Sequence, residues 1–124
     1  MLTSFSLVAA GGAIGAVLRY FLALALSGWH GFPVATLAAN IIGSFVLGCV
    51  VGRQTSKRFR LFLGTGICGG FTTYSTFALE IDRLFSGGQP LFAFGYLAIS
   101  LLFGTLAAYL GVIIGGRATK VSRT

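Results

Sequence analysis

The chain has 124 residues, of which 56% are hydrophobic and only 9% are charged. A soluble domain of this length needs more charged side chains to cover its surface, so the composition argues against one. The net charge of +7 would suit a nucleic-acid binder. However, the basic residues lie in short connections and in the tail, where they indicate membrane topology, and no nucleic-acid partner is expected.

Four apolar runs follow one another along the chain, separated by turn residues or charges. They cover roughly residues 5–26, 33–52, 61–79 and 90–116. Each run is long enough to cross a hydrocarbon core of about 30 Å as a helix. Glycines four residues apart occur in every run, and this spacing lets helices pack closely in lipid. The sequence therefore predicts an all-α membrane protein with one domain, residues 1–124, and four transmembrane helices.

Basic residues are concentrated on one side of this predicted bundle. With four spans, both termini share a side with the connection between the second and third runs. Seven of the nine Lys and Arg residues fall there: Arg53, Lys57, Arg58, Arg60, Arg117, Lys120 and Arg123. Arg83 lies on the other side, and Arg19 lies within the first run. This bias favours cytoplasmic termini in a multi-pass membrane protein.

Two polar side chains inside the first two runs need an explanation, because such groups are costly in lipid. Arg19 either extends to the membrane interface or lines a water-filled vestibule that attracts an anion. Asn40 lies near the middle of the second run. Its amide either bonds a neighbouring helix or donates to an anion.

The third run contains a segment of poor helix propensity, in which Gly69 and Gly70 are followed by Thr72 and Thr73. We expect the helix to be broken mid-membrane between Gly69 and Thr73. Such a break survives only where it is buried in protein or faces a cavity, and its freed carbonyls can bind a cation. The alternative is a continuous helix whose small residues serve packing.

Aromatic and hydroxyl side chains follow this segment. Tyr74 and Phe77 share one helical face, and their electropositive ring edges could face an anion, although packing is the commoner role of such a pair. The remaining hydroxyl groups are those of Ser75, Thr76, Tyr96 and Ser100. They either bond back to their own helices or form a track of hydrogen-bond donors with Asn40.

No nucleophile–base pair, metal-ligand cluster or phosphate loop is present in the sequence, so an enzyme is not expected. The lone His30 is expected in a connection. A proton-coupled drug exporter needs a carboxylate inside the membrane. Both acids of the chain, Glu80 and Asp82, are instead expected at a helix end, with no acid inside any span. A non-transporting assembly subunit would need only the glycine-rich helix faces.

Three segments carry motifs in a fixed order. Residues 11–20 read GGAIGAVLRY, residues 36–45 read TLAANIIGSF, and residues 69–77 read GGFTTYSTF. These resemble, in turn, the GGxxGxxxRY opening, the second-span motif and the GGxTTFSTF signature of the Fluc (CrcB) fluoride channels. The resemblance covers nearly the whole chain. It implies a fluoride-selective channel of a bacterial inner or plasma membrane. Such a channel passively exports cytoplasmic fluoride and so reduces fluoride toxicity.

The resemblance also implies an assembly and a set of sites. The assembly is an antiparallel, dual-topology homodimer with two pores and a structural sodium ion at its centre. Main-chain carbonyls of Gly69 and Thr72 would bind the sodium ion, and Arg19 would lie in a vestibule. The implied fluoride pore consists of Asn40, Tyr74, Phe77, Ser75, Thr76, Tyr96 and Ser100.

The sequence departs from the family pattern at three points. Tyr74 stands where the family usually has phenylalanine, and Gly104 stands where some relatives have a further hydroxyl. The seven-to-one distribution of basic residues favours a single orientation, whereas a dual-topology chain should show little bias. An antiparallel homodimer is the favoured assembly, and pairing with an oppositely oriented homologous chain is the alternative.

Overall fold

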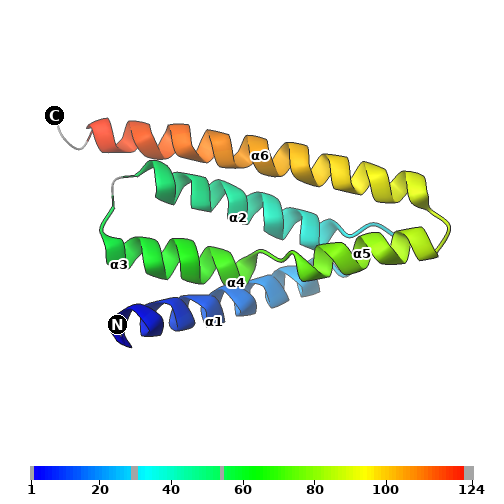
Figure 1. Ribbon diagram of the computed structural model, residues 1–124, viewed down its shortest axis with the longest axis horizontal. Helices are drawn as coiled ribbons and strands as arrows, with labels where there is room; N and C mark the ends of the chain where they lie inside the picture. Colours follow the sequence, from blue (N-terminus) through cyan, green and yellow to red (C-terminus); the bar gives the residue numbers. More distant parts are fainter. Residues whose placement is uncertain (1, 29–30, 54, 122–124) are drawn as a thin grey trace.

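The computed structural model describes residues 2–28, 31–53 and 55–121, and every regular element within them is helical (Figure 1). The elements are α1 (Leu2–Ala25), α2 (Val34–Gly52), α3 (Lys57–Phe59), the π-helical η1 (Arg60–Cys68), α4 (Gly69–Phe71), α5 (Ser75–Ser86) and α6 (Pro90–Val121). Because α3, η1 and α4 follow without interruption, they form with α5 one broken helical run. The chain therefore has four helices, as predicted, with the third one bent. The predicted positions His30 and Arg123 lie outside the described residues.

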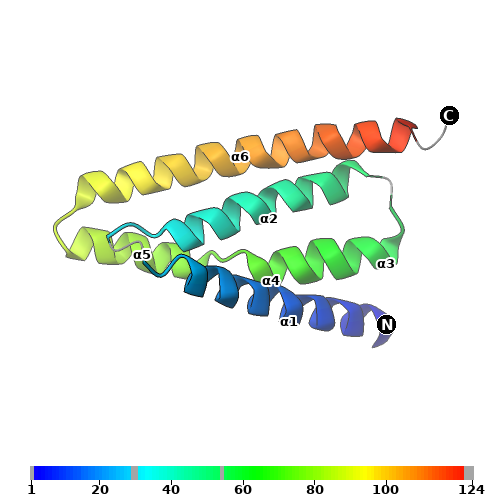
Figure 2. The ribbon, with the colours of Figure 1, turned by 180° about the vertical axis from the view of Figure 1, so that it is seen from behind.

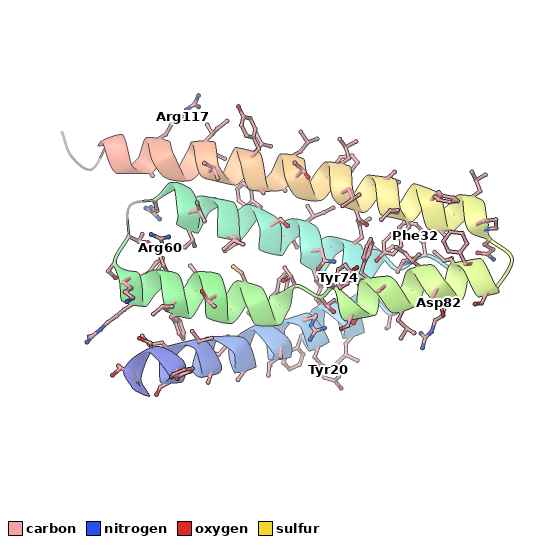
Figure 3. All side chains as sticks on the ribbon, viewed as in Figure 1. Tyr20, Phe32, Arg60, Tyr74, Asp82 and Arg117 are labelled. Atoms are coloured by element: carbon pink, nitrogen blue, oxygen red, sulfur yellow. The ribbon has the colours of Figure 1, made fainter. Side chains whose placement is uncertain are left out.

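The four helices lie side by side in the order α6, α2, broken run, α1 (Figures 1 and 2). The start of α1, the end of α6 and the connection from α2 to α3 lie at the same end. Figure 3 shows Arg60 and Arg117 toward this end and Asp82 toward the other. Arg60 and Arg117 therefore lie at the end of the bundle that also holds the start of α1 and the end of α6, where an even number of spans would place them.

The outer surface of the bundle is apolar. Three helices, α1, α2 and α6, are long and apolar enough to cross a membrane. Large side chains such as Phe5, Leu91 and Leu101 are more than half exposed, an arrangement that suits lipid or a partner helix and not water. The bent run is divided into shorter segments, but it lies alongside the other three (Figure 1).

Glycines form the closest helix contacts, as their four-residue spacing predicted. A Cβ atom on Gly48 would collide with the carbonyl of Ala108 on α6, and one on Gly70 would collide with the carbonyl of Gly12 on α1. Backbones approach this closely only where no side chain intervenes. The same glycines therefore fix two pairs of helices, α2 with α6 and α1 with the first half of the broken run.

The break in the third helix is shorter and later than the sequence indicated. Gly69 and Gly70 are helical in α4, and the irregular residues are Thr72, Thr73 and Tyr74. The expectation that the break begins at Gly69 is therefore wrong, because Gly70 serves packing against α1. The helix breaks at Thr73, whose backbone N–H and carbonyl are bonded to the Asn40 side chain.

The third helix also ends later than predicted. Its second half, α5, continues to Ser86 and not only to residue 79. Glu80 and Asp82 consequently lie within a helix of the bundle and not beyond its end. The other predicted spans differ from the observed helices by only a few residues at either end, since apolar composition marks them well and charges mark them poorly.

Candidate functional site

A groove of about 740 Å³ lies between α2, the broken run and α6. Apolar side chains form much of its wall, and Arg60 lies at one end. Its uncharged polar side chains are those of Asn40, Ser44, Thr65, Thr72, Thr73, Tyr74 and Ser100. Four of the predicted pore residues, Asn40, Tyr74, Phe77 and Ser100, line this groove, whereas Ser75, Thr76 and Tyr96 do not.

Asn40 is bonded to the break itself. Its amide oxygen accepts a hydrogen bond from the Thr73 backbone N–H at 2.8 Å, and its Nδ2 donates to the Thr73 carbonyl at 3.0 Å. This pair satisfies both backbone groups of a residue that has left the helix. A carboxamide has two N–H donors, and the second N–H of Asn40 makes no hydrogen bond to another described residue. Both sequence-based readings of Asn40 are therefore compatible with its geometry.

The break redirects the helical donors of at least two carbonyl groups, those of Gly69 and Thr72. In a continuous helix, the Gly69 carbonyl would accept from the Thr73 N–H, and the Thr72 carbonyl from the Thr76 N–H. Thr73 donates to Asn40 instead, and the Thr76 N–H donates to Thr73 Oγ1 at 3.2 Å. Gly69 and Thr72 both line the groove. They are the two positions whose carbonyls the sequence resemblance assigned to a cation.

A small cluster of hydroxyls caps the start of α5. Thr73 Oγ1 donates to Thr76 Oγ1 at 3.0 Å and lies 3.4 Å from Ser75 Oγ. Thr73 is buried, Thr76 is half-buried and Ser75 is exposed. The sequence analysis missed the central role of Thr73, whose Oγ1 accepts from the backbone N–H three residues later, as a capping threonine does.

Three aromatic rings follow one another from the groove into the protein. Tyr74 is 82% exposed, and Phe77 is only 9% exposed. Their ring centroids lie 6.5 Å apart, and the Phe77 and Tyr96 centroids lie 5.0 Å apart. Tyr74 lies at the break (Figure 3), so a ring that large has most of its surface uncovered within one chain.

Glu80 is the residue that the sequence reading placed most wrongly. Its two carboxylate oxygens accept hydrogen bonds from Thr36 Oγ1 at 2.7 Å and from the Tyr96 hydroxyl at 2.8 Å. Tyr96 is fully buried and Thr36 nearly so. An acid therefore lies inside the helical bundle. It shares a face with Phe77, three residues earlier, a spacing that the sequence reading did not use.

Arg19 lies apart from the groove. It lines a second hollow of about 290 Å³ with Thr36, Thr73, Thr76 and other residues of α1 and α2. Thr73 lines both hollows, so the break separates the predicted vestibule arginine from the predicted pore. The guanidinium lies on the α1 side and Asn40 on the α2 side of the same backbone segment.

An apolar helical bundle with a polar groove against a broken helix defines a multi-pass membrane protein. The family described as CrcB-like protein, Camphor Resistance (CrcB), matches residues 6–112. The chain belongs to this family.

Curated relatives match nearly the whole chain. It is 40% identical over 125 residues to the fluoride-specific ion channel FluC of Elusimicrobium minutum, covering 98% of this chain and 97% of the relative. It is 44% identical over 117 residues to the fluoride-specific ion channel FluC 1 of Listeria monocytogenes, covering 93% and 99%. It is 41% identical over 116 residues to the fluoride-specific ion channel FluC 2 of Bacillus cereus, covering 89% and 95%. The family is one of ion channels, which confirms that the protein is not an enzyme.

Proposed function

We propose that this protein is a fluoride-selective channel that lets cytoplasmic fluoride leave the cell passively. The observation that carries the proposal is the groove, in which spare hydrogen-bond donors of Asn40 and Ser100 lie among apolar walls. The relatives named as fluoride-specific channels support the choice of ion. Hydrogen fluoride crosses membranes as a neutral molecule and ionises in the cytoplasm, so the trapped anion needs a protein route outward.

Selectivity follows from size and hydration. Fluoride is small and tightly hydrated, so its water must be replaced by closely placed donors. Asn40 and the hydroxyls supply such donors, while the rings of Tyr74 and Phe77 present electropositive edges and narrow the path. A larger anion such as chloride would be excluded. Arg19, on the other side of the break, raises the local anion concentration in a vestibule.

A second, antiparallel copy would complete the pore. The groove is open on one side, and Tyr74 is 82% exposed at its rim. A second copy would cover that ring and close the groove, giving two pores related by symmetry. Labelling of one engineered cysteine in the C-terminal tail, from each side of the membrane separately, tests this assembly. Reaction from both sides supports the antiparallel homodimer, whereas reaction from one side requires an oppositely oriented homologous partner.

The break is suited to a structural sodium ion between the two copies. The break offers main-chain oxygens as ligands, and no group of three His, Cys, Asp or Glu side chains gathers within the described residues. The carbonyls of Gly69 and Thr72 have lost their helical donors and lie along the groove. Sodium is coordinated by unwound backbone carbonyls of this kind in other membrane proteins. The bound ion would add positive charge near the anion path.

Fluoride efflux from liposomes tests the function directly. The purified protein is reconstituted into vesicles loaded with potassium fluoride. Efflux is started with a potassium ionophore and followed with a fluoride electrode, or with a chloride electrode for chloride-loaded vesicles. We expect rapid fluoride release and no release from matched vesicles loaded with potassium chloride. Chloride release at a comparable rate would reject selectivity, and absence of both would reject the channel.

One observation favours a second candidate, a proton-coupled exporter of cationic drugs. Glu80 is a carboxylate inside the bundle, and such transporters exchange protons at an intramembrane acid. Drug-driven proton movement in the same vesicles, abolished by Glu80→Gln, would support it. However, Glu80 accepts hydrogen bonds from two hydroxyl groups. These bonds give the carboxylate a structural role that is sufficient without any transport activity.

A further inference from the structure

Helices α2 and α6 run in the same direction and pack in a fixed register (Figures 1 and 2). Gly48 lies against Ala108, and Gly52 lies against Val112. At these two glycines, the contacted residue of α6 lies 60 positions later in the chain. These backbone contacts are so close that sliding by one residue would bring side chains into the gap.

The register aligns polar residues of the two helices in successive levels. Thr36 pairs with Tyr96 at the first level, where both bond Glu80. Counting on by one turn, the same spacing matches Asn40 with Ser100, which line the same groove. One more turn matches Ser44 with Gly104, and Ser44 Oγ is the nearest atom to a Cβ placed on Gly104. Steps of four residues correspond to about 6 Å along a helix. The polar seam between α2 and α6 therefore has a third level, which only Ser44 supplies.

Ser44 is free to use its hydroxyl. It lines the groove and makes no hydrogen bond to another described residue, not even to the carbonyl of its own preceding turn that serine often uses in helices. At the second level, the Ser100 hydroxyl is buried and has no hydrogen-bond partner. Two adjacent levels of the seam thus carry hydroxyl groups without a hydrogen-bond partner among the described residues, and both serines line the groove.

Gly104 leaves space in front of the Ser44 hydroxyl. A Cβ atom on Gly104 would have Ser44 Oγ, at 3.9 Å, as its nearest neighbour. Unlike Gly48 and Gly111, Gly104 is therefore not required by a close backbone contact. At this level α6 has Gly104 and no hydroxyl, and Ser44 of α2 supplies one instead.

We propose that the Ser44 hydroxyl forms an anion subsite one helical turn along the groove from the level of Asn40 and Ser100. Its ligand is a small, strongly hydrated monovalent anion, fluoride under the proposed function on which this inference rests. Ser44 donates a hydrogen bond to the ion as it leaves Asn40 and Ser100. Hydrogen bonds to an ion are about twice as strong as neutral ones, so one hydroxyl is enough to lower the barrier at this step.

Moving the hydroxyl from α2 to α6 tests this subsite. Ser44→Ala removes the donor without adding volume, and we expect fluoride efflux from liposomes to fall roughly tenfold, as for loss of a hydrogen bond to a charged group. The double variant Ser44→Ala/Gly104→Ser returns a hydroxyl to the same level from the other helix. We expect it to recover most of the lost rate, because nothing but Ser44 stands near Gly104.

The controls distinguish loss of the subsite from misfolding and from failure of the proposed channel function. Thr105→Val removes a hydroxyl from an exposed position of α6 that does not line the groove, and it should leave efflux unchanged. Gel filtration and thermal melting of every variant report the assembly. If the wild type carries no fluoride, the proposed function fails. If the wild type does, either an unaffected Ser44→Ala variant or a double variant as slow as Ser44→Ala overturns the subsite.

Discussion

The two halves of the broken helix are held in the bundle by opposite means. The first half, from α3 to α4, packs against α1 through backbone contacts at Gly66 and Gly70. The second half, α5, is fixed by side-chain hydrogen bonds, from Asn40 to Thr73 just before its start and from Thr36 and Tyr96 to Glu80 about two turns after Thr73. Van der Waals packing therefore holds the first half rigidly against α1. The hydrogen bonds of the second half leave unpaired donors and carbonyls at the break, where an ion can reach them.

The largest effect is expected at the junction between the halves. Asn40→Ala removes a donor from the groove and leaves the N–H and carbonyl of Thr73 without partners. We expect fluoride efflux to be abolished, with a stability loss of about 1–3 kcal/mol from the unpaired groups. Liposome efflux and thermal melting measure the two effects.

Asn40→Asp separates the two roles of this side chain. It keeps an acceptor for the Thr73 N–H, loses both donors and adds a negative charge, so efflux should stay abolished while a dimer still forms. Normal efflux in either variant would show that Asn40 lies outside the ion path.

Adding a methyl group to the first half of the broken helix tests its close packing against α1. Gly70→Ala directs a Cβ atom into the carbonyl of Gly12, and overpacking of this kind costs about 1–3 kcal/mol. We expect a lower melting temperature, with efflux per folded dimer changed little. Gly12→Ala is the matched control on the opposite side of the same contact, because its Cβ would meet nothing within 4 Å. Equal melting temperatures for the two variants would contradict the close contact.

In the second half, Glu80→Gln weakens the triad of Thr36, Glu80 and Tyr96 without removing it. Both hydroxyls donate to the carboxylate, and an amide offers only one acceptor oxygen, so one hydroxyl must reorient. We expect a stability loss of about 1 kcal/mol, measured by thermal melting. Asp82→Asn, an exposed acid of the same helix, is the control and should melt like the wild type. A Glu80→Gln variant as stable as the control would mean that the triad contributes little.

The smallest effect is expected at Tyr74. Its ring is exposed at the groove, and its hydroxyl makes no hydrogen bond within the described residues. Tyr74→Phe keeps the ring edge, so efflux should change by less than about threefold. Phe77→Ile, which removes the buried ring edge nearby, should abolish efflux while the dimer remains. Loss of efflux in Tyr74→Phe would instead assign the hydroxyl a direct role at the ion.

Predictions from the sequence were confirmed where the type of residue alone determines the local structure. Apolar length located the four helices, and the spacing of Gly48 and Gly52 predicted a close helix contact that the structure contains. Predictions failed where the role of a residue depends on a distant partner. Gly69 and Gly70 looked like the cause of the break, and Glu80 looked like a helix-end charge. Their real environments are set by α1, α2 and α6, which no local pattern reveals.

By itself, the sequence determined that this chain lies in a membrane, as four helices with the third one broken, and which family it resembles. These features depend on composition, on apolar length and on short motifs, all of which are local. The tertiary structure alone decided where the break occurs, because Asn40 captures the backbone of Thr73 from 33 residues away. It also decided that Glu80 is inside the bundle and that Ser44 faces Gly104 across the groove. Hydrogen bonds and register between helices are long-range properties, so only the packed bundle specifies them.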